Sequence, residues 1–102
     1  MKYTVKIEND ALEQLSALTE FISHQSTPNT ALSISNKILE HAQSLELFPH
    51  RGTQRHYVRE GLRTINYRKR VVIAFTVNDD DMAVSVIGFF YGGRDWETIL
   101  GS

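Results

Sequence analysis

The chain has 102 residues with 41% hydrophobic and 23% charged side chains, and its formal net charge is −1. This composition is typical of a globular protein, so we expect a single domain over residues 1–102 with one hydrophobic core. The absence of cysteine excludes disulfides and thiolate chemistry. No apolar run approaches the roughly 20 residues that a membrane helix needs. Because the N-terminus also lacks the apolar stretch of a secretory signal, we expect a cytoplasmic protein.

The charge is unevenly distributed along the chain. Residues 51–70, the basic segment, hold seven of the eleven Lys and Arg against one acid, Glu60, which gives a net charge of +6. Residues 1–50 hold three Lys against six acids, and residues 71–102 hold Arg94 against five acids. A cationic segment in an otherwise acidic chain predicts a surface that binds phosphate or carboxylate groups.

The N-terminal residues predict a strand followed by a helix. Apolar and polar residues alternate over Tyr3–Glu8, as they do in a half-buried strand. Asp10, with Glu13 three residues later, predicts an N-cap. Apolar residues at helical spacing follow and end near His24-Gln25, which predicts the first helix.

A second helix is predicted after the turn at residues 26–29. Pro28 suits a first helical position. Apolar residues recur at helical spacing from Ala31 and end at Leu47-Phe48, before Pro49. Because the connection is short, we expect the two helices to be antiparallel neighbours.

The second half of the chain predicts an antiparallel meander. Its segments rich in Val, Ile, Thr, Phe and Tyr are Arg55–Val58, Leu62–Tyr67, Val71–Val77 and Ala83–Tyr91. Turn signals at Arg68–Arg70 and Asn78–Asp81 separate the last three. The predicted fold class is therefore α+β, with an N-terminal strand and an antiparallel two-helix hairpin packed on an antiparallel sheet of three to five strands.

The strand over residues 71–77 should place its alternate apolar residues, Val71, Ile73, Phe75 and Val77, against the helices. The last strand is apolar on both faces. Its second face should therefore be covered by something else, such as a partner protein.

Two arginines are the main candidates for anion binding. If Leu62 faces the helices, strand alternation places Arg63 on the open face of the sheet. Arg94 follows Gly92-Gly93, which permit a sharp turn. If the strands bring both arginines together, their guanidinium groups would hold one phosphate or carboxylate by forked hydrogen bonds. The alternative is that each lies flat on the sheet and pairs with a surface acid.

Other residues of the basic segment and the C-terminal region have less certain roles. Arg55 and Arg59 border the expected site, whereas Arg68–Arg70 is expected to be a solvated turn. Trp96, the only tryptophan, either caps the core or anchors an interface.

The basic segment also contains candidates for proton transfer. Metal-free RNA cleavage needs a base, an acid and groups that stabilise the phosphate. His56 and Tyr57 of the basic segment, and Tyr91 beside Arg94, could supply the base and the acid, since histidine titrates near neutral pH. The alternative is that His56 is an exposed strand residue and that Tyr57 and Tyr91 pack by their rings. The four histidines show no metal-ligand spacing, so we expect no metal and no cofactor.

Six motifs occur in a specific order along nearly the whole chain. They are the Leu12/Leu15/Leu18 helix, the Ala31…Ile38…Leu45 helix, Pro49-x-x-Gly52, Arg59-Glu60-Gly61-Leu62-Arg63, Val71-Val72-Ile73-Ala74-Phe75 and Gly92-Gly93-Arg94-Asp95-Trp96. With this order and spacing, the chain resembles the RelE/ParE superfamily of bacterial toxins from type II toxin–antitoxin systems. The resemblance implies a helical hairpin on an antiparallel sheet and a neighbouring antitoxin that neutralises the toxin.

The superfamily has two main activities, and the resemblance bears on both. RelE-like members cut mRNA in the ribosomal A site, and Arg63 and Arg94 fall where that group keeps phosphate-holding arginines. However, Arg55 and His56 stand where a lysine pair is expected, and a C-terminal segment carrying a tyrosine is missing. The Gly-Gly-Arg-Asp-Trp ending is more similar to the ParE-like branch, whose members bind DNA gyrase.

The resemblance therefore implies a ParE-like toxin that inhibits growth by binding DNA gyrase, with a role in plasmid stabilization. The residues expected to bind the target or the antitoxin are Arg55, Arg59, Arg63, Tyr91, Arg94 and Trp96. One alternative is a RelE-like ribosome-dependent mRNA endoribonuclease that uses Arg63 and Arg94 with His56 or Tyr91. A third is a toxin-like fold without toxicity. We expect an acidic antitoxin segment to fold onto the chain and cover Arg63 or Arg94.

Overall fold

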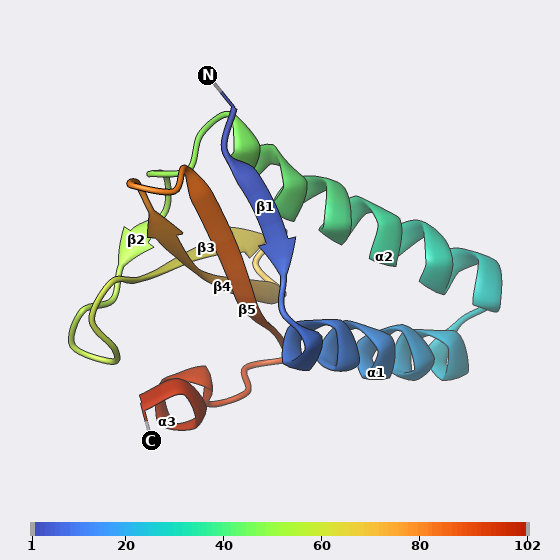
Figure 1. The fold of residues 1–102 in the computed structure, drawn as a ribbon. Coiled ribbons are helices and arrows are strands. Elements are labelled where there is room, and N and C mark those ends of the chain that lie inside the picture. Colours follow the sequence, from blue (N-terminus) through green and yellow to red (C-terminus); the bar gives the residue numbers. More distant parts are fainter. Residues whose placement is uncertain (1, 102) are drawn as a thin grey trace.

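The computed structural model describes residues 2–101 and has the order strand, two helices, four strands and a short C-terminal helix (Figure 1). The elements are β1 (Thr4–Ile7), α1 (Asn9–Gln25), α2 (Pro28–Gln43), the 3₁₀ turn η1 (Ser44–Glu46), β2 (Thr53–Gln54), β3 (Leu62–Tyr67), β4 (Val71–Asn78), β5 (Ala83–Tyr91) and α3 (Trp96–Gly101). The predicted α+β class and the antiparallel helical hairpin are confirmed.

The strands form one five-stranded sheet in the order β1-β5-β4-β3-β2. The pairs β2–β3, β3–β4 and β4–β5 are antiparallel, as predicted, whereas β1 pairs with β5 in parallel. The sheet is therefore mixed rather than wholly antiparallel. A parallel pair needs a long crossover connection, and the two helices with the β2–β4 meander supply it here.

The helix boundaries follow local capping signals only in part. Helix α1 begins at Asn9 after Glu8, which makes no side-chain capping bond, so the predicted N-cap at Asp10 is wrong. Asp10 instead lies in the first turn, where a negative charge interacts favourably with the helix dipole. Helix α2 begins as predicted, because Pro28 takes a first-turn position and the Thr27 hydroxyl accepts a 3.1 Å hydrogen bond from the Thr30 amide.

The end of the second helix lies earlier than its apolar pattern predicts. Helix α2 ends at Gln43, and the chain tightens into η1, which buries Leu45. The apolar pair Leu47-Phe48, predicted to end the helix, lies beyond η1 and is exposed. Helical spacing alone does not distinguish an α-helix from a final 3₁₀ turn.

Both faces of the sheet are covered, each by a different part of the chain. Helices α1 and α2 cover one face, here called the hairpin face, and Val71, Ile73 and Phe75 of β4 are buried against them as predicted. On the opposite face, Phe90 packs with Leu100 of α3, and Figure 1 shows α3 apart from the two-helix hairpin. The second apolar face of β5 is thus covered by the chain's own C-terminal helix, which the sequence pattern did not predict.

A second difference concerns residues 55–58, predicted to be a strand. They lie in a loop of consecutive turns over residues 55–61, and the preceding Thr53–Gln54 form the short edge strand instead. The amides of Val58 and Leu62 donate to the carbonyls of Arg55 and Arg59, each at 3.0 Å. These local hydrogen bonds replace the strand pairing that β-propensity alone would favour.

The chain turns sharply at Gly52, where the neighbouring atoms leave no room for a side chain. Its φ is +88°, a conformation that favours glycine, and an added Cβ would lie 2.4 Å from the Thr64 carbonyl oxygen. The chain can therefore turn here and bring β2 against β3 only because this residue has no side chain.

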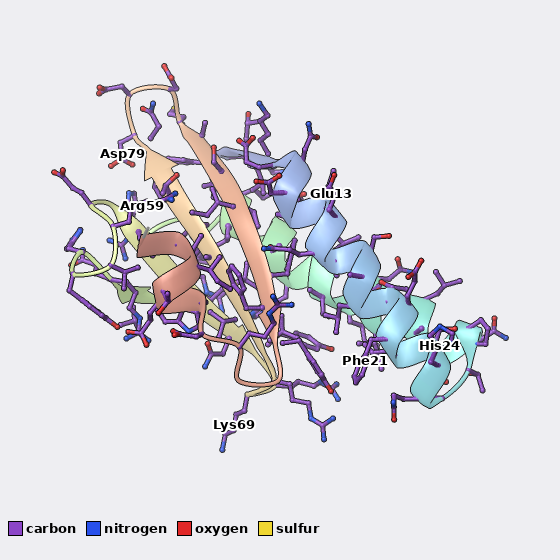
Figure 2. All side chains as sticks on the ribbon, turned by 90° about the horizontal axis from the view of Figure 1, so that it is seen from below. Glu13, Phe21, His24, Arg59, Lys69 and Asp79 are labelled. Atoms are coloured by element: carbon purple, nitrogen blue, oxygen red, sulfur yellow. The ribbon has the colours of Figure 1, made fainter. Side chains whose placement is uncertain are left out.

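Two charged turns close the ends of β4. The Arg68–Arg70 turn joins β3 to β4, and the Asp79–Asp81 turn joins β4 to β5, as predicted. Figure 2 shows Lys69 and Asp79 at opposite ends of the sheet. The uneven charge of the sequence therefore becomes a polarity along the strands, with a cationic end near Lys69 and an acidic end near Asp79.

Candidate functional site

Arg63 does not lie on the face that we expected. Leu62 is buried with Phe90 and Leu100 on the α3 face, so alternation places Arg63 with Ile65 on the hairpin face. Its guanidinium Nη1 donates a 2.8 Å hydrogen bond to the His50 carbonyl. The condition that Leu62 faces the helices is not met, because α3 provides a second apolar layer on the other side of the sheet.

Arg63 and Arg94 also fail to converge. Arg63 pairs with Phe75 in the ladder, whereas Arg94 follows the end of β5, where Tyr91 is paired with Val71. Hydrogen bonds from Tyr3 and His50 are the main causes of the lowered Asp79 pKa, and the charge of Arg63 lowers it further, which places Arg63 toward the acidic end of the sheet. Arg94 instead lines hollows near the cationic end, and Arg63 lines neither of them.

The residues that do meet Arg94 come from the turn that we expected to be merely solvated. Lys69 and Arg70, from the β3–β4 turn, line a hollow of about 380 Å³ together with Arg94 and the indole of Trp96. We call it the cationic hollow. Val72 and Phe90 give it apolar walls. It combines three positive charges and an aromatic surface with two carboxylates, so cations exceed acids by one. The guanidinium groups and the ring suit a carboxylate or phosphate group next to an apolar contact.

Two acids, Asp95 and Glu97, also line the cationic hollow, and both accept hydrogen bonds from hydroxyl groups. The Asp95 carboxylate accepts hydrogen bonds from the Thr98 hydroxyl at 2.6 Å and amide at 3.2 Å, and these bonds lower the Asp95 pKa. Glu97 accepts a 2.6 Å bond from the Tyr57 hydroxyl, which raises the Tyr57 pKa. Within residues 2–101, no carboxylate forms an ion pair with Lys69, Arg70 or Arg94.

The loop over residues 55–61 holds α3 in place next to this hollow. The Arg55 guanidinium lies over the Trp96 ring at 5.3 Å, and its Nε donates a 3.1 Å bond to the Thr64 hydroxyl. Trp96 packs, half-buried, against the Leu62–Phe90 cluster, so it caps part of the core and also lines the hollow. Arg55 therefore acts on this site by positioning Trp96.

The remaining candidates lie in other places. His56 is not a strand residue, because it sits in the turns of the loop, where its Nδ1 accepts a 3.2 Å bond from the Gly61 amide. Arg59 lines a separate hollow near the start of α1, and Figure 2 shows it on the side of the sheet where α3 lies. Tyr91 packs on Phe21 of α1, with the ring centroids 5.8 Å apart. The predicted proton-transfer residues are therefore dispersed.

Tyr91 and Arg94 are the exception, since both line a groove of about 540 Å³ between α1 and the end of β5. Asp10 and Glu13 also line this groove, so its charge is mixed. It includes neither His56 nor Arg63.

Metal binding and membrane insertion are two further possibilities for the residues that the structure describes. No group of three or more His, Asp or Glu residues between positions 2 and 101 is placed to hold a metal ion. No helix in that range is long and apolar enough to cross a membrane.

Comparison with known proteins identifies the family. The family model for the ParE toxin of the type II toxin–antitoxin system parDE matches residues 5–96. The chain therefore belongs to the ParE toxin family of type II toxin–antitoxin systems, as the motifs suggested. No curated protein sequence gives a match.

Solved structures support the same fold. The chromosomal ParDE toxin–antitoxin system of P. aeruginosa contains a chain with a TM-score of 0.76 and 19% identity, which covers 88% of this chain and 96% of that chain. The RelBE2 toxin–antitoxin complex of Mycobacterium tuberculosis contains one with a TM-score of 0.62 and 17% identity, covering 90% of this chain and 100% of that chain. At these identities the likeness shows the fold.

Proposed function

We propose that this toxin arrests bacterial growth in the cytoplasm by binding DNA gyrase and that a cognate antitoxin neutralises it. The observation that carries the proposal is the dispersal of the ribonuclease candidates. Arg63 is bonded to the His50 carbonyl on the hairpin face, and His56 is bonded within its own loop. General acid–base cleavage needs base, acid and phosphate ligands around one reacting centre, and such an arrangement is absent among these residues.

The cationic hollow suits a binding inhibitor. Lys69, Arg70 and Arg94 present three positive charges without ion-pair partners among residues 2–101, and Trp96 adds a rigid aromatic contact. Aromatic and arginine side chains of this kind frequently dominate the binding energy of protein interfaces. We propose that acidic groups on gyrase occupy the hollow, with Arg55 holding Trp96 in the position to receive them.

The RelE-like alternative has one observation in its favour. Tyr91 and Arg94 line the same groove, so a proton donor and a phosphate ligand lie near each other. Asp10 and Glu13 outnumber the single cation of that groove, Arg94, and oppose the approach of a phosphate backbone, whereas the cationic hollow has three cations against two acids. This arrangement makes mRNA cleavage the second candidate.

Expression of this chain in bacteria without an antitoxin distinguishes gyrase inhibition, mRNA cleavage and a fold without toxicity. For the gyrase proposal we expect growth arrest, loss of negative supercoiling in a reporter plasmid, and translated mRNA that stays intact in primer extension. Cuts in translated mRNA with normal supercoiling would establish the RelE-like alternative. Normal growth on full expression of the folded chain would favour a toxin-like fold without toxicity.

A further inference from the structure

The loop after β5 leaves two backbone amides without partners. Gly92 and Gly93 have φ values of +68° and +76°, in the left-handed region, and a Cβ added at either would meet no atom within 4 Å. The amides of Gly93 and Arg94 make no hydrogen bond among residues 2–101, and neither residue belongs to a helix or strand. A ligand can therefore approach this backbone closely and accept hydrogen bonds from it.

The same loop is fixed next to the β3–β4 turn. The Gly92 amide donates a 3.3 Å hydrogen bond to the Arg70 carbonyl. Gly93 and Arg94 line the cationic hollow together with Lys69 and Arg70. Free amides in a turn, surrounded by cationic side chains, form a concave site that suits the oxygen atoms of a phosphate group.

The conformation of Lys69 supports a binding role for its side chain. Its φ is 62°, in the left-handed region that Gly and Asn adopt with less strain. A long cationic side chain occupies this position instead and lines the hollow. Strained backbone conformations of this kind commonly occur at ligand-binding sites.

Trp96 gives the hollow a planar apolar surface beside the cations. Arg55 lies over the Trp96 ring at 5.3 Å but does not line the hollow, so part of the ring that Arg55 leaves uncovered faces the hollow. Val72 and Phe90 continue this apolar wall. Aromatic side chains bind nucleobases by stacking, whatever the base. Phosphate-binding groups and a stacking surface are therefore combined in one hollow.

The acids in and around the hollow favour one nucleotide over a nucleic-acid strand. Asp95 and Glu97 line the hollow, and Asp10 and Glu13 line the adjoining groove that shares Arg94 with it. A strand carries a phosphate at every nucleotide and would bring further negative charges against these acids. The hollow, of about 380 Å³, brings its three cations to bear on one phosphate group.

We propose that the cationic hollow binds a free nucleotide. Its phosphate is held by the side chains of Lys69, Arg70 and Arg94 and by the free amides of the loop, and its base lies against Trp96. A bound nucleotide would occupy the cations that we assign to acidic groups of gyrase, so nucleotide and gyrase would compete. This competition rests on the proposed function, whereas nucleotide binding itself does not.

The first test uses Trp96 as the reporter, because it is the only tryptophan. The probe is adenosine monophosphate (AMP), titrated into the purified toxin, and we expect a saturable change in Trp96 fluorescence. Adenosine, which lacks the phosphate, and ribose phosphate, which lacks the base, should each bind about tenfold more weakly or worse. No saturable change with AMP would overturn the site, and equal affinity for ribose phosphate would overturn the contact between base and Trp96. An oligodeoxyadenylate that binds more than about tenfold tighter than AMP would overturn the free nucleotide in favour of a strand.

A double variant tests the cations. Lys69→Ala/Arg70→Ala should bind AMP about 100-fold more weakly, roughly tenfold for each charge removed. The matched control Lys2→Ala/Lys6→Ala removes the same charge from the N-terminal end of the chain and should stay within about twofold of the wild type. All four side chains are exposed, so the fold should persist, which circular dichroism checks. Wild-type affinity in Lys69→Ala/Arg70→Ala, or an equal loss in the control, would contradict the proposal.

Nuclear magnetic resonance tests the backbone donors. The amide signals of Gly93 and Arg94 should shift on addition of AMP, with the same midpoint as the fluorescence change. Gly61 is the control, because it also has a positive φ and open surroundings but its amide already donates to His56 Nδ1. Its signal should not move. Signals of Gly93 and Arg94 that stay fixed while the fluorescence saturates would show that the loop amides do not hold the phosphate.

The competition needs a separate measurement of toxin binding to purified gyrase. AMP at ten times its own dissociation constant should weaken toxin binding to gyrase about tenfold, whereas the same concentration of adenosine should have no effect. Unchanged gyrase affinity with the hollow saturated by AMP would show that gyrase uses another surface, while the nucleotide site stands. If the toxin does not bind gyrase at all, the proposed function fails, and the fluorescence and resonance titrations still decide the nucleotide site.

Discussion

The Arg55 guanidinium lies 5.3 Å from the centre of the Trp96 ring and joins the loop after β2 to the start of α3. The same side chain donates a hydrogen bond to the Thr64 hydroxyl. Because a planar guanidinium makes both contacts at once, lysine cannot replace it. The position of Trp96 in the cationic hollow therefore depends on a residue forty-one positions earlier in the chain.

Replacing Arg55 by Lys should loosen α3 without disrupting the rest of the sheet. Loss of the hydrogen bond and the ring contact should lower the free energy of unfolding by about 1–2 kcal/mol. Trp96 is the only tryptophan, so its fluorescence reports on this site alone. We expect its emission to shift to longer wavelength in Arg55→Lys and to stay unchanged in the control Arg51→Lys. An unchanged spectrum in Arg55→Lys would mean that the contact does not position Trp96.

The β3–β4 turn should lower the stability of the fold while its cations contribute to binding. Replacing Arg68-Lys69 by Asn-Gly matches the left-handed conformation of both positions and should raise the free energy of unfolding by about 1 kcal/mol. The same change removes one cation, Lys69, from the cationic hollow. Urea denaturation should therefore show a more stable protein, and a plasmid supercoiling assay should show weaker inhibition of gyrase because the cationic hollow has lost a cation. A variant that is less stable than the wild type would show that the turn is not strained.

Some of the architecture could be predicted because its signals are local. The strand alternation at Tyr3–Glu8, the Pro28 helix start and the Asp-rich turn each depend on neighbouring residues, and the structure confirms all three. Helix α3 was missed although Trp96, Ile99 and Leu100 have helical spacing. Six residues give too short a period to recognise, and here the helix depends on packing against Phe90.

The arrangement of the candidate site could not be predicted either, because it depends on packing between residues that are distant in the sequence. Alternation shows that Leu62 and Arg63 face opposite ways, but it does not show which way, and the choice depends on what covers each face. With α3 on one side, Leu62 has an apolar environment there and Arg63 is left on the hairpin face. Lys69 and Arg70 gain a common hollow with Arg94 only through the pairing of β4 with β5, which places residues distant in sequence together.

The acidic end of the sheet should make stability depend on pH through Asp79. Its carboxylate accepts 2.7 Å hydrogen bonds from the Tyr3 hydroxyl and the His50 imidazole, and these bonds lower the Asp79 pKa below its ordinary value of 3.8. A carboxylate with a lowered pKa stabilises the folded state fully above that ordinary value, and the contribution is lost as the pH falls below it. Removing the carboxylate should therefore matter only when it is ionised.

We expect Asp79→Asn to lower the thermal unfolding midpoint at pH 6 and to leave it nearly unchanged at the lowest pH at which the protein still folds. The control Asp80→Asn changes the adjacent exposed residue and should be close to wild type at both pH values. Equal midpoints for Asp79→Asn and wild type at pH 6 would contradict the prediction.

The stability of the folded state should also depend on pH through His41, at a higher pH than through Asp79. Its ring packs edge-on against Tyr67 at 5.7 Å, and its buried Nε2 has no hydrogen-bond partner among the described residues. Burial and the nearby charge of Arg51 lower the His41 pKa below its ordinary value of 6.5, although the backbone of Asn66 acts in the opposite direction. The folded state therefore loses stability as the pH falls below 6.5, because the unfolded chain takes up the proton more readily.

Replacing His41 by Phe keeps the ring and removes the titrating group. We expect urea midpoints of His41→Phe to change less than those of the wild type between pH 7 and mildly acidic pH. His24→Phe alters an exposed histidine and serves as the control, with a pH dependence like that of the wild type. A wild-type pH dependence in His41→Phe would assign the effect to another group.

The most direct measurement is inhibition of purified DNA gyrase in a plasmid supercoiling assay. The wild-type toxin should block supercoiling, Arg94→Ala should require about tenfold more protein for the same effect, and Lys2→Ala should match the wild type. Gyrase that remains fully active at toxin concentrations sufficient to bind the antitoxin would contradict the proposed function. Equal inhibition by Arg94→Ala and wild type would remove the cationic hollow from it.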